Sequence, residues 1–594
     1  MDTLKPDHPR LLAHAEDFDR IRELVTTDPL AKRWYTALKQ EAERLVDEPV
    51  AVYELRDGRR LLYVSREVLR RVKTLGLLHR IEPKRAYRER IWADVRAVSA
   101  FDHWNPAHFL DVAEMGLAVA LAYDWLYDDW TEAQRETMRG AMVRHALEPA
   151  LEAYDRRDWW TRTKINWNQV CNGALIAVAL AIADEEPALS SRMIDRAVAA
   201  LPISMKRYAP DGGYDEGPGY WGFGTVYNVL AIASLESALG QDFGLGDAPG
   251  FDVTGSFPVQ ATGPTTRAFN FGDGRPRTPK SPAMFFFAKR YDQPGYARFA
   301  ARHNRGGVLD LLWYDPEIIV KRPKPLPLGR VFDSAGVGVL RSAWDDPRAW
   351  YVGLKGGAID HGHAQMDLGS FILESQGVRW FIDLGPDDYN LPGYFESDRP
   401  RWRYYRNRAE GHNTLVVNPG QSGGQRRDAD AKVALAEGAL HADLTSAYPG
   451  EVGRTIGLDA SAGLVRVADR FAFDRPSEVW WFAHTTASIA LTADRRAADL
   501  VQEGKCLRAR IVSPEGARFA VMDAGPLPGS PDPAGQNPNN GAVLLNPSPG
   551  AHFVVRGQTP RYGDADPSKT VRKLAIRLEG VTQGRIEVVF ENVE

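Results

Sequence analysis

The chain changes character at Val320-Lys321-Arg322-Pro323-Lys324-Pro325-Leu326-Pro327. Proline fixes φ and has no backbone N–H to donate, so this alternating run of prolines predicts an extended connector. Patterns typical of helices come before the connector, and patterns typical of short strands come after it. We therefore expect an α+β protein with two large domains, residues 1–325 and 326–594.

The first domain carries helical patterns separated by loops rich in glycine and aromatic residues. Thr131 and Gln134 form a capping-box pattern, which predicts a helix start at Glu132. Pro202 is expected to kink or restart the helical pattern around it. Helix, loop and helix in repetition is typical of an α/α toroid, an incomplete barrel whose loops line a cleft. The predicted helical segments are 109–127, 132–154, 173–184, 192–208, 227–239 and 284–303, and the main loop is 210–224.

The second domain shows short strand patterns at regular spacing. Ser375-Gln376-Gly377 has the composition of a hairpin turn between two of them. Regular short strands with turn signals favour an antiparallel β-sandwich. The predicted strands include 335–340, 350–354, 371–374, 380–383, 414–417 and 479–482.

The composition is that of a folded protein, with 44% hydrophobic and 26% charged residues among 594. These values exclude wholesale disorder, a collagen-like repeat and a coiled-coil rod. The formal net charge of −4 provides no overall positive charge that would attract nucleic acid or an anionic membrane, so we expect neither as a partner. Many of the 16 Trp and 21 Tyr lie near glycine and aspartate, which is a hint of carbohydrate binding.

Two cysteines, Cys171 and Cys506, stand far apart in unlike contexts, so we expect two free thiols. Residues 1–7 contain no apolar signal region, and the longest apolar stretch, 173–183, is too short to span a bilayer. We therefore expect a cytoplasmic protein, or a periplasmic one if a signal peptide has been removed. The oligomeric state is left open, with a homodimer as one alternative.

Histidines gather after the connector. His361 and His363 stand two positions apart on a segment expected to be extended, so their side chains point the same way. Two imidazoles and one carboxylate suit a divalent ion such as Zn²⁺, so His363, Asp383 and His412 are candidate ligands, with His361 left free. The spacings match no compact zinc motif, and the alternative is that these are core or surface histidines.

Two polar stretches of the helical domain are candidate parts of a site. The stretch 211–222 presents Tyr214 and Tyr220, whose hydroxyl groups could donate or accept a proton, beside Glu216 and Trp221 as substrate contacts. Its alternative is a loop clamped by aromatic packing. In the stretch 166–172, Asn166 or Asn168 could bind a substrate carboxylate, or one of these residues could simply cap the following helix.

Arg401-Trp402-Arg403-Tyr404-Tyr405-Arg406-Asn407-Arg408 is a basic and aromatic run. Guanidinium groups pair bidentately with carboxylate or sulfate, so Arg406 and Arg408 are candidate ligands for acidic sugars. The run is short and the chain slightly acidic, which disfavours nucleic acid, and a solvated charged face is the other alternative.

The sequence resembles the heparinase II/III-like superfamily of polysaccharide lyases, which includes heparinases and exo-acting alginate and oligoalginate lyases. The resemblance spans most of the chain and implies an α/α toroid followed by an antiparallel β-sandwich. It rests on His8-Pro9-Arg10-Leu11, on 166–173, on Pro210-Asp211-Gly212-Gly213 through Tyr220, on 361–370 and on His412-Asn413-Thr414-Leu415.

The resemblance implies β-elimination on a polysaccharide or oligosaccharide that contains uronic acid, which leaves a 4,5-unsaturated uronate end. Tyr220 then corresponds to the catalytic acid and can also serve as base, with Tyr214 and Tyr227 as nearby alternatives. His361 corresponds to a base or carboxylate neutraliser that faces the cleft. The structural Zn²⁺ site is implied at His363, Asp383 and His412.

One departure concerns Asn166-Trp167-Asn168, because many relatives carry a histidine there. Asn166 or Asn168 can still bind the substrate carboxylate, but the base must then be Tyr220 or His361.

Two other functions stay open from the sequence. A glycoside hydrolase on the same toroid would need a carboxylate pair, for which Asp215 and Glu216 are candidates, although adjacent residues cannot easily flank a bond. A protein that binds acidic glycans without cleaving them is the second alternative.

Overall fold

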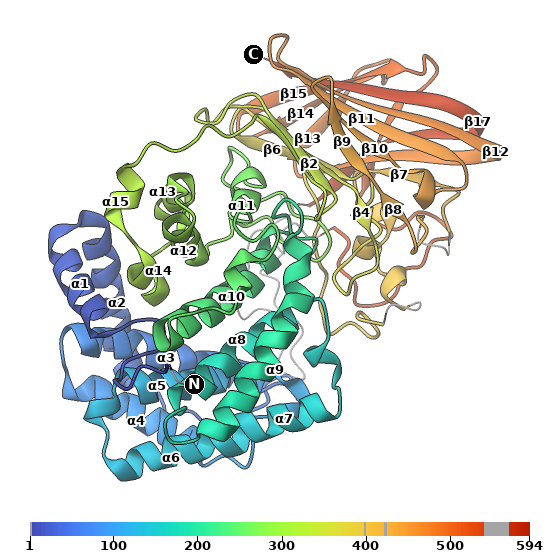
Figure 1. Cartoon of the computed structure of the whole chain (residues 1–594). Helices are drawn as coiled ribbons and strands as arrows, with labels where there is room; N and C mark the ends of the chain where they lie inside the picture. Colours follow the sequence, from blue (N-terminus) through green and yellow to red (C-terminus); the bar gives the residue numbers. More distant parts are fainter. Residues whose placement is uncertain (1–2, 397–399, 421–423, 540–569, 594) are drawn as a thin grey trace.

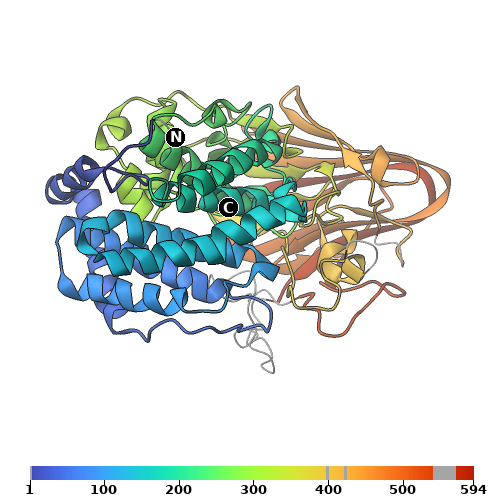
Figure 2. The ribbon, with the colours of Figure 1, turned by 60° about the horizontal axis from the view of Figure 1, so that its bottom comes forward.

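A computed structural model describes residues 3–396, 400–420, 424–539 and 570–593. Helices fill the first half of the chain and strands fill the second, and the two halves lie side by side (Figures 1 and 2). The last helix ends at Val320 and the first strand begins at Gly329, on either side of the proline-rich connector. The predicted order of a helical domain followed by antiparallel sheets is confirmed.

Fifteen α-helices are described in the first half, with longer connections at 48–61, 240–255 and 261–282. A π-helical segment, Val143–Leu147, joins α6 to α7. The bounds are α1 Ala15–Thr27, α2 Pro29–Asp47, α3 Leu62–Ile81, α4 Arg85–Ser99, α5 Leu110–Trp125, α6 Glu132–Met142, α7 Glu148–Asp155, α8 Asn166–Ala181, α9 Pro187–Met205, α10 Gly217–Leu239, α11 Ser256–Gln260, α12 Ala283–Arg290, α13 Pro294–His303, α14 Val308–Trp313 and α15 Pro316–Val320.

Helix α8 is central, since it packs against α5, α9 and α10. Nearly every one of its side chains is buried, as its all-round apolar sequence predicts. The helix begins at Asn166, earlier than predicted, and its N-cap is Ile165 without a side-chain cap. The capping interpretation of the asparagines is therefore wrong, because these residues lie inside the first turns of the helix.

Three helical predictions needed correction. The loop prediction 210–224 is wrong in its second half, because α10 starts at Gly217 with Pro218 in its first turn, where proline costs no hydrogen bond. Burial of α10 outweighs the weak helix propensity of its glycines.

The segment 284–303 was expected to be one helix, but it forms two helices, which are separated at Asp292, where φ is +49. Pro202 lies within α9, which continues to Met205. The predicted capping box of Thr131 and Gln134 is confirmed.

The opening of the chain is tied to the helical core. The Asp124 carboxylate near the end of α5 accepts hydrogen bonds from the backbone N–H groups of Arg10 and Leu11, at 3.0 and 2.8 Å. The buried Arg10 guanidinium donates to the carbonyl of Leu180 in the last turn of α8, at 3.1 Å. These bonds satisfy polar groups that a helix end leaves unpaired, so the His8-Pro9-Arg10-Leu11 motif has a structural role.

The second half contains antiparallel sheets. A smaller sheet has the order β1-β2-β3-β5-β6, a larger one has the order β13-β14-β15-β17-β12-β11-β10-β9 with β16 on β17 and β7 on β12, and β4 pairs with β8. The bounds are β1 Gly329–Phe332, β2 Val337–Arg341, β3 Tyr351–Lys355, β4 Gly357–Ala358, β5 Phe371–Ser375, β6 Val378–Phe381, β7 Leu415–Val417, β8 Asp430–Ala431, β9 Val433–Ala436, β10 Ala439–Asp443, β11 Glu451–Asp459, β12 Leu464–Thr485, β13 Ser488–Leu491, β14 Ala497–Gln502, β15 Lys505–Ser513, β16 Phe519–Asp523 and β17 Arg572–Val593.

One apolar core joins these sheets. The Phe381 ring of β6 lies 4.9 Å from the Phe590 ring of β17, and Phe371 of β5 contacts the same ring. The predicted hairpin turn is present between β5 and β6, with positive φ at both Gln376 and Gly377.

Both cysteines are free thiols, as expected, with Cys171 buried in α8. Among the described residues, no helix has the length and apolar character needed to cross a membrane.

Close backbone contact between α8 and α10 generates a stability prediction. A Cβ added at Gly173 would lie 2.4 Å from the carbonyl oxygen of Tyr227, so Gly173→Ala must push the two buried helices apart. We expect a loss of about 1–3 kcal/mol in the free energy of unfolding, measured by urea and thermal denaturation.

Gly222→Ala is the matched control on the same helix pair. Its Cβ would meet Pro279 at an ordinary 3.6 Å, so this variant should be neutral or more stable by up to about 1 kcal/mol. Equal stability of the two variants would contradict the close approach.

Candidate active site

The loop before α10 anchors the helical half to the strand half. The Asp211 carboxylate accepts hydrogen bonds from the backbone N–H of Asp333 and from the Ser334 hydroxyl, both at 2.5 Å. Gly212 has φ +84, and a Cβ there would lie 2.6 Å from the backbone of Thr254. Only glycine fits this position, so the Pro210-Asp211-Gly212-Gly213 motif fixes the entry to α10 at the boundary of the two halves, which we call the seam.

Glu216 is the N-cap residue of α10 and is only 1% exposed. Its Oε2 atom accepts hydrogen bonds from Tyr214 at 3.2 Å, Arg207 at 3.3 Å and Asn166 at 3.5 Å. Its Oε1 atom lies 2.6 Å from Nδ1 of His363, which belongs to the strand half. Burial alone would raise the pKa of Glu216, but the Arg207 charge and the His363 bond hold it at about 2. Glu216 is therefore ionised and has both oxygen atoms engaged.

The histidine loop of the strand half meets the helical half at this point. The His363 ring stacks on the Tyr220 ring, with centroids 4.0 Å apart and an interplanar angle of 18°. The carbonyl of His363 accepts a hydrogen bond from the Asp273 N–H at 3.0 Å. Gly272 permits this approach, because a Cβ there would lie 2.6 Å from the same carbonyl oxygen. Contacts on both sides therefore orient His363.

His361 lies in the same loop, beside a buried polar cavity that Glu216 and His363 also line. Burial lowers the pKa of His361 to about 3, so its imidazole is neutral. Its Nδ1 atom is buried and has no hydrogen-bond partner among the described residues. A neutral imidazole with an unused nitrogen can accept a proton from a bound substrate.

Tyr220 lies in the first turn of α10. Its hydroxyl oxygen is 2.6 Å from that of Tyr389, on a loop of the strand half. Burial, together with the charge of Asp273, raises the pKa of Tyr220, so the phenol keeps its proton. The structure thus gathers four predicted catalytic or substrate-binding residues at the seam, namely Tyr220, His361, Asn166 and Glu216, with the predicted substrate contact Tyr214 behind them.

Other predicted residues lie elsewhere. The side-chain amide oxygen of Asn168 accepts a hydrogen bond from the Ser204 hydroxyl at 2.8 Å inside the helical core. Trp221 is fully buried and donates to Thr254 at 2.8 Å. Tyr227 is two turns further along α10 than Tyr220. Trp167, at the position where relatives carry histidine, packs edge to face against the His108 ring at 4.7 Å.

The arginines at positions 406 and 408 of the basic run are interior residues that bond other parts of the strand half. Arg406 and Arg408 are fully buried. Arg406 donates to the carbonyls of Asn537 and Leu384, and Arg408 forms an ion pair with Glu410 at 2.7 Å. Buried guanidinium groups with these partners are not available to a sugar. The predicted sugar contacts of this run are therefore corrected to interactions that hold the chain segment.

The three predicted zinc ligands are not gathered. His412 Nδ1 lies 2.8 Å from an Asp383 carboxylate oxygen, while His363 is engaged with Glu216. No group of three or more His, Cys, Asp or Glu side chains in the described part of the chain is arranged to hold a metal ion. The residues do not fit the expected site as they stand, so zinc stays a prediction from the sequence and no chemical step depends on it.

Two residues of this cluster escaped the sequence reasoning. Arg207 forms ion pairs with both Asp215 and Glu216, and Tyr389 faces Tyr220. The position of Arg207, three residues before the Pro210-Asp211 motif, was a usable signal for the first. Tyr389 follows the Asp387-Asp388 pair in an irregular loop, where no periodicity marks it.

A recess of about 550 Å³ opens in the helical half beside Gly219, the neighbour of Tyr220 in the chain. Gly219, Gly222 and other residues along one face of α10 line it, and so do three cations, Lys73, Arg277 and Lys280. No aspartate or glutamate occurs among the described residues that line it. Burial and the charges of Arg275 and Arg305 lower the pKa of Arg277, and burial with the charges of Arg305 and Arg277 lowers the pKa of Lys280. Such a cluster of like charges favours an anionic ligand.

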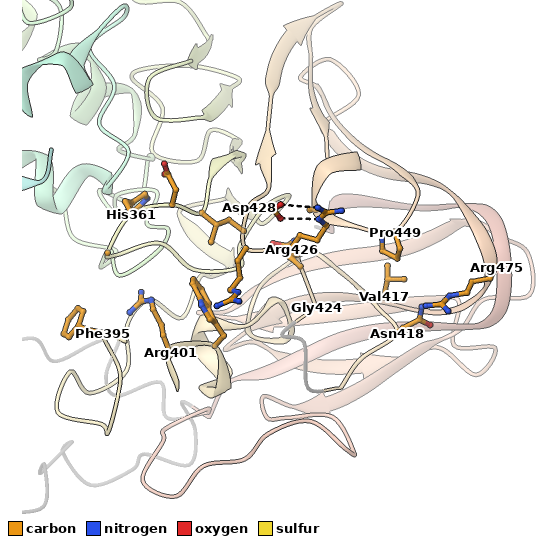
Figure 3. A pocket seen from close by; sticks show the side chains of 17 residues that line it. His361, Phe395, Arg401, Val417, Asn418, Gly424, Arg426, Asp428, Pro449 and Arg475 are labelled. Carbon is orange, nitrogen blue, oxygen red and sulfur yellow. Dashed lines mark hydrogen bonds and ion pairs between the residues drawn. The ribbon is translucent and has the colours of Figure 1, made fainter. Parts of the chain in front are cut away.

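A wider groove of about 1020 Å³ lies on the strand half (Figure 3). His361, Phe395 and Arg401 lie at one end of it, and Asn418 and Arg475 lie at the other. Arg426 and Asp428 form an ion pair between these ends, at 3.1 Å. The groove therefore begins at a residue of the candidate active site.

Comparisons with known proteins concern the fold and the second half of the chain. Residues 324–548 match the family described as "Heparinase II/III-like, C-terminal". A crystal structure of heparinase III has a TM-score of 0.60 and 13% identity, over 88% of this chain and 77% of that one. A heparan sulfate lyase from Pedobacter heparinus has a TM-score of 0.56 and 13% identity, over 97% and 88%. No curated protein matches the sequence.

At 13% identity the two solved structures establish the fold alone, and they confirm the predicted toroid followed by a sandwich. Residues 324–548 therefore match the heparinase II/III-like C-terminal family, and the chain as a whole is similar in fold to heparinase III.

Proposed function

We propose that this protein is a polysaccharide lyase that cleaves an acidic, uronate-containing glycan by β-elimination. The observation that carries the proposal is the meeting of Tyr220 and the histidine loop at the seam, beside a recess lined by cations. The fold supports it, because solved structures that share this fold are named heparinase III and heparan sulfate lyase.

β-Elimination needs three things from the protein. The proton at C5 of the uronate must be removed, the adjacent carboxylate must be neutralised so that this proton becomes acidic, and the 4-linked oxygen must receive a proton as it leaves. The base must be neutral before the reaction and the acid must carry its proton. The product is a 4,5-unsaturated uronate end.

The candidate residues have these protonation states. His361 is neutral and lines the open groove, so its imidazole can take the C5 proton of a substrate that reaches it there. Tyr220 is a neutral phenol, so it can protonate the leaving oxygen. Asn166 supplies a neutral amide donor to the same cluster, and the two lysines and the arginine of the recess supply charge to neutralise the carboxylate.

Glu216 acts as a positioning residue. Its ionised carboxylate holds His363 at 2.6 Å, and the His363 ring stacks on Tyr220. Full engagement of both carboxylate oxygens also disfavours a glycoside hydrolase, because Glu216 has no oxygen free to reach a sugar. A protein that only binds glycans would have no use for the proton-transfer pair.

Removal of one hydroxyl tests the assignment. Tyr220→Phe should lower kcat by about 10²–10⁴-fold, since the general acid is lost while the ring still stacks on His363. The assay is the ultraviolet absorbance of the unsaturated product with a panel of alginate, glucuronan and heparan sulfate.

Tyr291→Phe is the control, because its hydroxyl bonds the Gly246 carbonyl at 2.6 Å in another part of the helical half. It should keep normal activity. Near-normal turnover in Tyr220→Phe, with folding retained, would exclude the tyrosine as acid.

Neutralising the seam carboxylate gives a different signature. The neutral amide in Glu216→Gln cannot balance the charge of Arg207, and it cannot hold His363 as the ionised carboxylate does. We therefore expect kcat to fall at least tenfold, with a smaller change in KM. The thermal midpoint should also fall, because breaking a buried ion pair leaves an unpaired charge and costs about 3–5 kcal/mol.

Glu132→Gln, at an exposed ion pair with Arg135, serves as the control and should change neither property. Unchanged kcat in Glu216→Gln would remove the positioning role.

Cations of the recess should govern affinity. The double variant Arg277→Ala/Lys280→Ala should raise KM for the acidic polymer roughly tenfold or more, with kcat less affected, since hydrogen bonds to charged groups are worth about 1.5–3 kcal/mol each. The difference from wild type should shrink as salt is added.

The exposed pair Lys289 and Arg302 lies outside the recess, so Lys289→Ala/Arg302→Ala is the matched control. Equal KM values for the two double variants would argue against the recess as the anion site.

A further inference from the structure

Apart from His361 at one end, the groove on the strand half has no role in the chemistry proposed above. Its lining residues all lie at or beyond position 359, whereas those of the recess all lie at or before position 309. His361 lines the groove, and Gly219, the neighbour of Tyr220, lines the recess. The two hollows therefore belong to different halves of the protein, and each reaches the seam beside a catalytic candidate.

The active-site end of the groove offers an aromatic surface. Phe395 is 47% exposed, and its ring lies edge-on to the His363 ring at 6.2 Å. The rings of Tyr389 and Tyr394 support it from the protein side, at 4.8 and 5.4 Å. The part of such a ring that stays exposed at the mouth of a site suits the apolar face of a sugar ring.

Charge dominates further along the groove. Four arginines and two aspartates line it, and Arg401 is already paired with Asp273 beneath the surface. Arg426 is 64% exposed on its ion pair with Asp428. Arg475, at the far end in Figure 3, is exposed and forms no ion pair with any residue that the structure describes. An exposed guanidinium without a carboxylate partner can bind carboxylate or sulfate bidentately.

We infer that this groove binds the sugars of the same acidic chain on the far side of the cleaved bond from the recess, so that the enzyme cuts within a chain. The inference rests on the proposed lyase function. An enzyme that removes single terminal units needs binding sites for several sugars on one side of the bond only. Here anion-binding hollows lie on both halves, with the catalytic candidates between them.

The size of the groove agrees with this. Pockets for drug-sized ligands occupy about 300–1,000 Å³, and the groove has about 1020 Å³ while remaining open to solvent. It has room for more than one sugar, with Phe395 beside the cleaved bond and Arg475 several units away.

The test compares product size and affinity. Size-exclusion chromatography of early digests of alginate, glucuronan or heparan sulfate should show products of intermediate length, not single units. Arg426→Ala/Arg475→Ala should raise KM for the polymer at least tenfold and leave KM for the shortest cleaved oligosaccharide unchanged. It should also weaken retention of the protein in native gels that contain the polymer.

Arg508→Ala/Arg518→Ala is the matched control, since Arg508 pairs with Asp499 at the surface and Arg518 donates to the backbone carbonyls of Glu515 and Ala517. This variant should behave as wild type in all three measurements. Release of single units from the start, or an unchanged polymer KM in the groove variant, would overturn the inference while the lyase function stands.

Gel retention distinguishes failure of the lyase proposal from failure of the groove proposal. If no polymer yields unsaturated product, the lyase function fails and internal cleavage fails with it. Retention that the groove variant alone reduces would then still establish the groove as a glycan site, whereas equal retention of both variants would eliminate it.

Discussion

The buried carboxylate of Glu216 is the interaction on which the candidate site depends. An ionised group out of water is stable only with several donors, since its desolvation costs several kcal/mol. The helical half supplies three donors, from Arg207, Tyr214 and Asn166, and the strand half supplies His363. The carboxylate is therefore satisfied only when the two halves are docked, and docking in turn orients the ring that stacks on Tyr220.

The seam keeps catalytic groups neutral and leaves charged groups in the hollows around it. His361 and Tyr220 are uncharged because burial disfavours their ionised forms. The cations that could meet an acidic glycan lie in the recess and the groove. This arrangement accounts for an overall charge of −4 in a protein proposed to bind anions, because local charge and net charge are independent.

Some parts of the site followed from residue type and neighbours alone. Tyr220, His361, Asn166 and Glu216 come from short stretches with unusual polar and glycine content, and the structure gathers them. The basic run misled, because Arg406 and Arg408 look like surface residues in the sequence but bond carbonyls and Glu410 in the interior. Burial of a guanidinium depends on partners over 100 positions away, such as Asn537, and no local pattern encodes it.

The sequence by itself determined the division into a helical and a strand half, because the two periodicities and the proline-rich connector are local properties. Tertiary structure alone decided that His363 turns to Glu216, 147 positions away, and not to the pair of Asp383 and His412. It also decided that α10 begins at Gly217, since burial against α8 outweighs the weak helix propensity of glycine. The partner that a histidine bonds and the residue at which a helix begins both depend on the surroundings in space. A local stretch of sequence does not specify those surroundings.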